Sequence, residues 1–129
     1  MNKTVRLMLV LALVFVAAPA FSGDAVQMWR CEMDDDASEA QVRARAQDWL
    51  KAAKELPGGE NLQAFVLFPI AVNAMGEIDV MFVVVAPSFE EWGKFWDAYA
   101  DSPANAIDEL NKDDVVCPDS VLWESFKME

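Results

Sequence analysis

The sequence predicts an α+β domain in which helices cover one face of a four-stranded antiparallel sheet. Apolar segments with the two-residue period of strands alternate with two amphipathic segments that begin with helix-capping motifs. They follow one another as strand, helix, strand, strand, helix, strand, with no internal linker. This order is typical of an α+β domain with split pairs of strands.

Residues 1–22 have the three parts of a secretory signal peptide. Lys3 and Arg6 form a basic leader, residues 7–18 are an uninterrupted apolar run, and small residues follow. The alternative is a membrane anchor, but a run of 12 residues is too short to cross about 30 Å of hydrocarbon. We therefore expect an exported protein, periplasmic or secreted, with one domain over residues 23–129 and no membrane span after cleavage.

Composition excludes several classes of function. With 22 acidic and 10 basic residues, the net charge is −12, so nucleic acid is not an expected partner. The chain has no histidine, which removes Ser-His-Asp and Cys-His catalysis and histidine ligation of zinc or haem. The 2 cysteines, Cys31 and Cys117, predict one disulfide in an exported chain. Two free thiols or a catalytic pair are the alternatives.

The first strand is expected over residues 25–33, which are rich in strand formers. A helix over residues 38–56 follows, with one apolar stripe, and Pro57 and two glycines end it. Capping-box spacing occurs twice at its start. The two pairs are Asp36 with Glu39 and Ser38 with Gln41.

The next two strands are expected over residues 62–72 and 77–86. Pro69 cannot donate to a central ladder, so the earlier strand should lie at an edge of the sheet. The later strand is apolar on both faces, and such a strand is normally covered on both sides. Its two faces carry Ile78, Val80, Phe82 and Val84 on one side and Met81, Val83 and Val85 on the other.

The second helix should begin at Ser88, which has capping-box spacing to Glu91. Ser102 and Pro103 interrupt it, a further short helix follows, and a last strand is expected over residues 120–128. In that strand Trp123 and Phe126 should face opposite sides, one under the helices and one on the other face.

This arrangement predicts a ferredoxin-like βαββαβ fold with strand order 4-1-3-2. That order places the strand with Pro69 at an edge and brings Cys31 near Cys117. Two helices cover only one face, and soluble monomers rarely expose the large apolar patch that would remain. We expect a homodimer that packs its open sheet faces together. The alternative is that residues 21–25 and 103–119 fold over that face.

The domain resembles the dimeric α/β-barrel superfamily, which includes antibiotic-biosynthesis monooxygenases. The most similar part is the aromatic segment PSFEEWGKFWDAYADSP, residues 87–103. The resemblance implies a substrate pocket between helices and sheet, with an Asn and a Trp, often with a His, in cofactor-independent oxygenases. Trp92 or Trp96 matches the Trp, whereas the chain has no His and its first strand has no Asn.

The aromatic segment is the main candidate for a ligand site. Phe89, Trp92, Trp96 and Tyr99 share one helix face, with Phe95 at its edge. They either pack on the sheet as core or line a pocket in which the Trp N–H and Tyr O–H groups orient a ligand. A glycine within a helix costs about 1 kcal/mol relative to alanine, so Gly93 suggests close packing or room for a ligand.

Arg30 lies in the first strand and either receives a ligand carboxylate in the cleft or pairs within the protein. The expected protein partners are Glu32, Asp79 and Glu124. The full set of ligand-pocket candidates is Arg30, Trp49, Trp92, Gly93, Trp96 and Tyr99.

We expect no metal and no cofactor. The three adjacent carboxylates of residues 34–36 cannot all face one ion, and helix capping accounts for Asp36. The sequence favours a non-catalytic binding or structural module. The alternatives are a cofactor-independent monooxygenase-like enzyme for a small aromatic or apolar molecule, and an acidic protein that meets a basic partner. A cavity above about 300 Å³ with convergent polar groups would favour a ligand site over a purely structural role.

Overall fold

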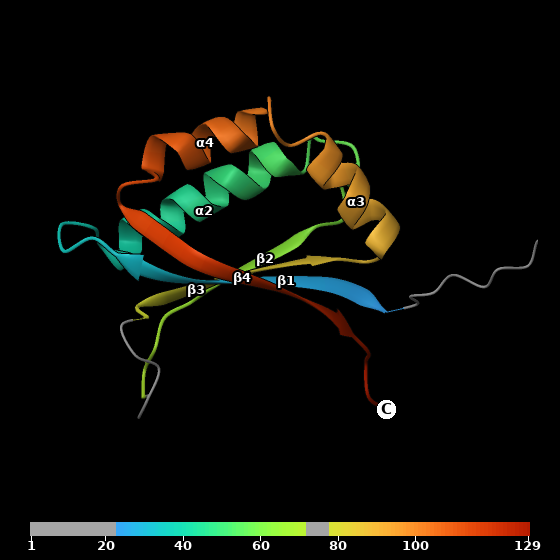
Figure 1. The fold of residues 1–129 in the computed structure, drawn as a ribbon, viewed down its shortest axis with the longest axis horizontal. Coiled ribbons are helices and arrows are strands. Elements are labelled where there is room, and N and C mark those ends of the chain that lie inside the picture. Colours follow the sequence, from blue (N-terminus) through green and yellow to red (C-terminus); the bar gives the residue numbers. More distant parts are fainter. Residues whose placement is uncertain (1–22, 72–77) are drawn as a thin grey trace, which may run out of the picture.

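The computed structural model describes residues 23–71 and 78–129. Within these ranges the helices pack as one layer on a single antiparallel sheet (Figure 1). The elements are β1 (Asp24–Met33), α2 (Glu39–Ala53), β2 (Gln63–Leu67), β3 (Val80–Ala86), α3 (Phe89–Asp97), α4 (Pro103–Asn111) and β4 (Val115–Ser125). The strand order is β2-β3-β1-β4, which is the expected 4-1-3-2 order seen from the other edge. The fold is ferredoxin-like.

The expected signal peptide, residues 1–22, lies outside the described residues, as do the turn and strand start in residues 72–77. Among the helices that the structure does describe, none has the length and apolar character needed to cross a bilayer. The signal peptide therefore stays a prediction.

The start of α2 is set by Ser38. Its hydroxyl accepts from the backbone N–H of Gln41 at 3.2 Å, and the Gln41 side chain accepts from the Ser38 N–H at 2.9 Å. This reciprocal pair satisfies two backbone donors that the helix itself leaves unpaired. The Ser38 capping box is confirmed, and the capping role expected of Asp36 is wrong. The Asp36 N–H instead donates to Asp34 Oδ1 in the preceding turn.

β2 lies at an edge of the sheet, as Pro69 predicts. It is shorter than expected and ends at Leu67, so the proline follows the strand rather than lying within it. A proline has no N–H to continue the ladder, which explains why the strand stops before it.

β4 begins at Val115 rather than at residue 120 because it pairs with the end of β1. The disulfide between Cys31 and Cys117 joins these two strands, with Cα atoms 4.0 Å apart, and confirms the expected pairing. The register shifts at this point, between Arg30 and Glu32. Pro118 is tolerated in β4 because this strand is the other edge of the sheet.

The core between helices and sheet is centred on Phe95, which is fully buried. The other four aromatic side chains of the aromatic segment are only partly buried. Placing Phe95 at the edge of the apolar face was therefore wrong. The error arose because the prediction assumed one continuous helix as far as Tyr99. In the structure α3 ends at Asp97, and Tyr99 follows in a turn.

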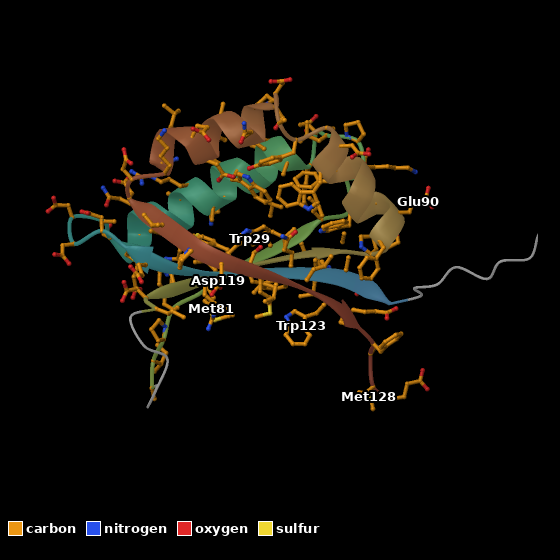
Figure 2. The ribbon with its side chains drawn as sticks, in the orientation of Figure 1. Trp29, Met81, Glu90, Asp119, Trp123 and Met128 are labelled. Carbon is orange, nitrogen blue, oxygen red and sulfur yellow. A yellow bond between two sulfur atoms is a disulfide. The ribbon has the colours of Figure 1, made fainter. Side chains whose placement is uncertain are left out.

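None of the helices in the described part of the chain lies on the opposite face of the sheet (Figure 1). Trp29 points toward the helices, whereas Met81 and Trp123 point away from them (Figure 2). The strand register places a continuous apolar set on this side, which we call the open face. Its members are Val26, Met28, Phe65, Leu67, Met81, Val83, Val85, Val121 and Trp123.

Neither segment proposed as an alternative cover lies over the open face in the part of the chain that is described. Residues 103–119 form α4, which packs beside α2, and the start of β4 within the sheet (Figure 1). We expected either Trp123 or Phe126 to pack under the helices. Trp123 points away from them, and Phe126 follows the end of β4 and is 61% exposed, so this expectation was wrong. Within residues 23–71 and 78–129, nothing covers the apolar open face.

Candidate functional site

A cavity of about 530 Å³ lies between the helical layer and the sheet. Residues of β1, β3 and β4 line its sheet side, and residues of α2, α3 and α4 line its helix side. Cys117 contributes to the lining, so the disulfide is part of the wall. Pockets of about 300–1,000 Å³ with mainly apolar walls are typical of sites for small molecules.

Four aromatic side chains form a connected wall of this cavity. The rings of Trp29 and Trp96 have centroids 5.9 Å apart, and those of Trp96 and Tyr99 lie 4.7 Å apart at 63°. Trp49 continues the wall, 6.4 Å from Tyr99. Trp96 Nε1 is buried and, among the described residues, is the side-chain donor left without an acceptor.

A chain of hydrogen bonds crosses the aromatic wall from α2 to α4. Trp49 Nε1 donates to Tyr99 Oη at 2.9 Å, and the Tyr99 hydroxyl donates to Asp108 Oδ2. Burial raises the pKa of Tyr99 well above its ordinary value, and the bond to Asp108 adds to this effect. Burial also raises the pKa of Asp108, although hydrogen bonds from Tyr99 and Trp49 act in the opposite direction. Asp108 is thus a carboxyl group that has lost part of its hydration.

The two cationic side chains that line the cavity both have acidic partners. Arg45 pairs with Asp114, and Lys112 Nζ lies 3.6 Å from Glu109 Oε2. Asp108 has no such cationic partner among the described residues, where its polar contacts are with Tyr99 and Trp49. The cavity therefore has one carboxylate whose charge no neighbouring cation balances.

Three of the residues predicted from sequence lie together on the cavity wall: Trp49, Trp96 and Tyr99. Trp92 is not part of the lining. Its Nε1 donates to Gln27 Oε1 at 3.1 Å, which ties α3 to the central strand β1. Gly93 lies outside the cavity too, and a Cβ added there would meet nothing within 4 Å. The close helix–sheet approach considered for Gly93 is absent.

Arg30 lies on the opposite side of the sheet from the cavity, on the open face with Met81. Its Nε donates to Asp119 Oδ1 at 2.9 Å, and its second guanidinium nitrogen bonds Oδ2 of the same carboxylate. This pairing lowers the pKa of Asp119 and raises that of Arg30. The partners expected from sequence were wrong. Asp79 accepts from the Met33 N–H and Glu124 from the Gly23 N–H instead.

Sequence reasoning missed Trp29 and Asp108 as cavity residues. Trp29 had an incomplete signal, because it shares a strand face with Cys31, but the sequence does not show which face of this strand the helices cover. Asp108 had none, since an acidic residue in a short helix of an acidic protein resembles any solvent-facing charge.

The site is suited to holding and orienting a molecule. Both cysteines are in the disulfide and the chain has no histidine, so neither thiolate nor imidazole chemistry is open to it. Asp108 is the lining carboxyl group with a raised pKa and is the natural proton acceptor. Across residues 23–71 and 78–129, no cluster of three or more acidic or cysteine side chains is placed to hold a metal ion.

No family model and no curated protein matches the chain. Solved structures do resemble it. One is a protein assigned as a chlorite dismutase, with 9% identity, 83% of this chain and 44% of that chain covered, and a TM-score of 0.49. Another is a dimeric ferredoxin-like protein of unknown function from Thermobifida fusca, with 15% identity, coverage of 81% and 92%, and a TM-score of 0.46.

A chlorite dismutase of Candidatus Nitrospira defluvii has 17% identity, coverage of 84% of this chain and 42% of that chain, and a TM-score of 0.43. The chain thus spans less than half the length of the chlorite dismutases it resembles. The strand order of the chain itself confirms the expected ferredoxin-like fold. Activity and ligand are not transferred from these structures.

Proposed function

We propose that this protein is an exported, homodimeric binding module that holds a small, largely apolar or aromatic molecule in the cavity between its helices and its sheet. The cavity itself carries the proposal. A purely structural module would fill the space between its layers, whereas here about 530 Å³ remains open against Trp29, Trp49, Trp96 and Tyr99. Aromatic walls with a few polar groups are what a small apolar ligand requires.

Binding is favoured over catalysis by the inventory of reactive groups. The cavity offers one aromatic hydroxyl, Tyr99, and one carboxyl group with a raised pKa, Asp108, which are bonded to each other. Burial has raised the pKa of Tyr99, so its hydroxyl is a weaker acid than usual. These groups can orient a ligand through hydrogen bonds without any bond being broken.

The open face supports the homodimer. Phe65, Leu67 and Trp123 are each about half exposed there in the single chain. Covering apolar surface yields about 25 cal/mol per Å², and sheets stack face to face about 10 Å apart. Arg30 and Asp119, which lie on the same face, already satisfy each other through two hydrogen bonds. A second copy can therefore cover them without leaving an unpaired charge in the interface.

Export is supported by two independent features. Residues 1–22 have the composition of a signal peptide. The Cys31–Cys117 disulfide is of a kind that forms and persists in oxidising compartments.

The indole N–H signals of the 5 tryptophans provide the test of the binding site. Titration of ¹⁵N-labelled protein with benzyl alcohol should shift the signals of Trp29, Trp49 and Trp96. The signals of Trp92, bonded to Gln27, and of Trp123, on the open face, are internal controls. Shifts confined to Trp123, or no shifts at millimolar probe, would reject the cavity as a binding site.

Native mass spectrometry of protein purified from the exported fraction tests the remaining parts of the proposal together. We expect a dimer mass, an intact disulfide and a retained small molecule. Conversion of a bound aromatic molecule to an oxygenated product in air would instead place the protein with the monooxygenase-like enzymes.

A further inference from the structure

We infer that the cavity selects an organic cation, a molecule with an apolar or aromatic body and one amine or quaternary ammonium group that lies beside Asp108. This inference rests on the proposed function, because it assumes that the cavity is a ligand site. It adds the chemical class of the ligand.

The charges of the lining residues provide the first argument. Arg45 and Lys112 are the cations of the lining, and Asp114 and Glu109 pair with them. Asp108 is left as the carboxylate that no cation balances in the described part of the chain. A ligand cation would supply the missing partner, and a charge-assisted contact is about twice as strong as one between neutral groups.

The position of Asp108 beside the aromatic wall provides the second argument. The Tyr99 hydroxyl donates to its Oδ2, and Trp49 in turn donates to the Tyr99 oxygen. This carboxylate is therefore held next to two ring systems, although the residue itself is solvent-exposed. Ammonium groups are attracted to Trp and Tyr rings within about 6 Å of the ring centre. A carboxylate and aromatic rings together are the side chains that recognise an organic cation.

The raised pKa of Asp108 is consistent with this arrangement. Its first cause is burial of the carboxyl group, which disfavours the charged form. A cation placed beside the carboxylate would act in the opposite direction and stabilise the charged form. Binding of the cation should for this reason be strongest when Asp108 is ionised.

The charge of the whole chain disfavours the opposite class of ligand. With a net charge of −12, the protein repels small anions and concentrates small cations near its surface. An anionic aromatic molecule would also meet Asp108 inside the cavity. A neutral molecule would leave this carboxylate without a cationic partner.

Three probes of similar size and different charge test the inference on the full domain with its disulfide intact. They are benzyltrimethylammonium, benzyl alcohol and phenylacetate. We expect the cation to bind at least about tenfold more tightly than the alcohol, measured by calorimetry and by the indole N–H shifts of Trp29, Trp49 and Trp96. Phenylacetate should bind most weakly.

The variant Asp108→Asn should weaken binding of the cation about tenfold and have a much smaller effect on binding of benzyl alcohol. Asp101→Asn is the matched control, because it removes the same charge from an exposed residue outside the cavity lining. The comparison separates the effect of the local contact with Asp108 on cation binding from the effect of the overall negative charge of the protein. If Asp108→Asn does not fold, the three-probe comparison on the natural protein decides alone.

The possible results distinguish failure of the inference from failure of the proposed function. Equal affinity for the cation and the alcohol would overturn the inference while the cavity remained a binding site. Cation binding that Asp101→Asn weakens as much as Asp108→Asn would also overturn it, in favour of general charge attraction. If none of the probes shifted the cavity tryptophans, both the inference and the proposed function would fail.

Discussion

The rings of Phe95 in α3 and Trp49 in α2 meet edge to face, with centroids 6.0 Å apart and planes at 76°. Phe95 belongs to the buried hydrophobic core, and Trp49 lines the cavity. The contact therefore lies at the boundary between the packed and the open parts of the helix–sheet interface. Changes on either side of this boundary should have different effects, one on stability and the other on binding.

Phe95→Ala should lower the free energy of unfolding by about 3–5 kcal/mol, because the side chain is fully buried and its removal leaves a void in the core. Urea denaturation measures the change. Phe126→Ala serves as the control, since this ring is 61% exposed, and it should change stability by less than about 0.5 kcal/mol. Similar losses for the two variants would show that Phe95 is not the centre of the core.

Gly93→Ala should stabilise the protein by about 1 kcal/mol. The added methyl group meets no atom within 4 Å, so only the gain in helix propensity remains. Gly58→Ala provides the contrast, because Gly58 has a φ of 77° and its added Cβ would lie 2.3 Å from the backbone oxygen of Glu91. It should be destabilising. Thermal unfolding of the two variants compares them, and a loss of stability in Gly93→Ala would point to a packing role that the structure does not show.

Trp123→Glu should convert the dimer to a monomer at micromolar concentration. The side chain is exposed on the open face in one chain, so the cost arises only when a second copy buries the new charge. We expect the dissociation constant to rise by at least about thirtyfold, equivalent to about 2 kcal/mol. Sedimentation velocity gives the measurement.

Leu110→Glu makes a similar change on α4, at a side chain 84% exposed in the helical layer, and should leave the dimer intact. If natural protein already sediments as a monomer at these concentrations, the proposed interface is wrong.

The raised pKa of Asp108 predicts how stability depends on pH. The folded pKa lies above the ordinary value of 3.8, so the folded protein holds this proton more tightly than the unfolded chain. The stabilising contribution is present below the unfolded pKa and is lost as pH rises through the folded pKa. Relative to Asp108→Asn, the stability of the natural protein should therefore fall as pH rises from below 3.8 through the raised pKa of the folded state.

Urea denaturation at several pH values would show this fall. Tyr99→Phe removes the hydrogen bond that lowers the pKa of Asp108, so in that variant the fall should move to higher pH. If the natural protein instead became more stable relative to Asp108→Asn as pH rises, the pKa of Asp108 would not be raised in the folded state.

The sequence predicted the fold well because local signals agreed with one another. Ser38 and Ser88 each cap a helix as their spacing to Gln41 and Glu91 indicates. Pro69 correctly marked β2 as an edge strand, and the order of elements sufficed for the sheet topology. Strand ends were less accurate. β4 starts at Val115 because it pairs with β1, and such long-range pairing leaves no local pattern in the chain.

The candidate site was predicted only in part. Helical period placed Trp96 correctly among residues that face the sheet, yet it cannot show which of these contact other side chains and which line a gap. That distinction depends on the distance between α4 and the sheet. The pairing of Arg30 with Asp119 was missed for a similar reason, since it depends on the register of β4 against β1.

The disulfide joins the central strand to the outermost one, and this has a consequence for aggregation. β4 is a long strand at an edge of the described sheet, and an edge strand can pair with a strand of another chain. While Cys31 and Cys117 are bonded, β4 cannot detach from β1, and Pro118 removes one donor from the exposed edge. Reduction releases that strand, so the reduced protein should form thioflavin-positive fibrils sooner than the oxidised protein.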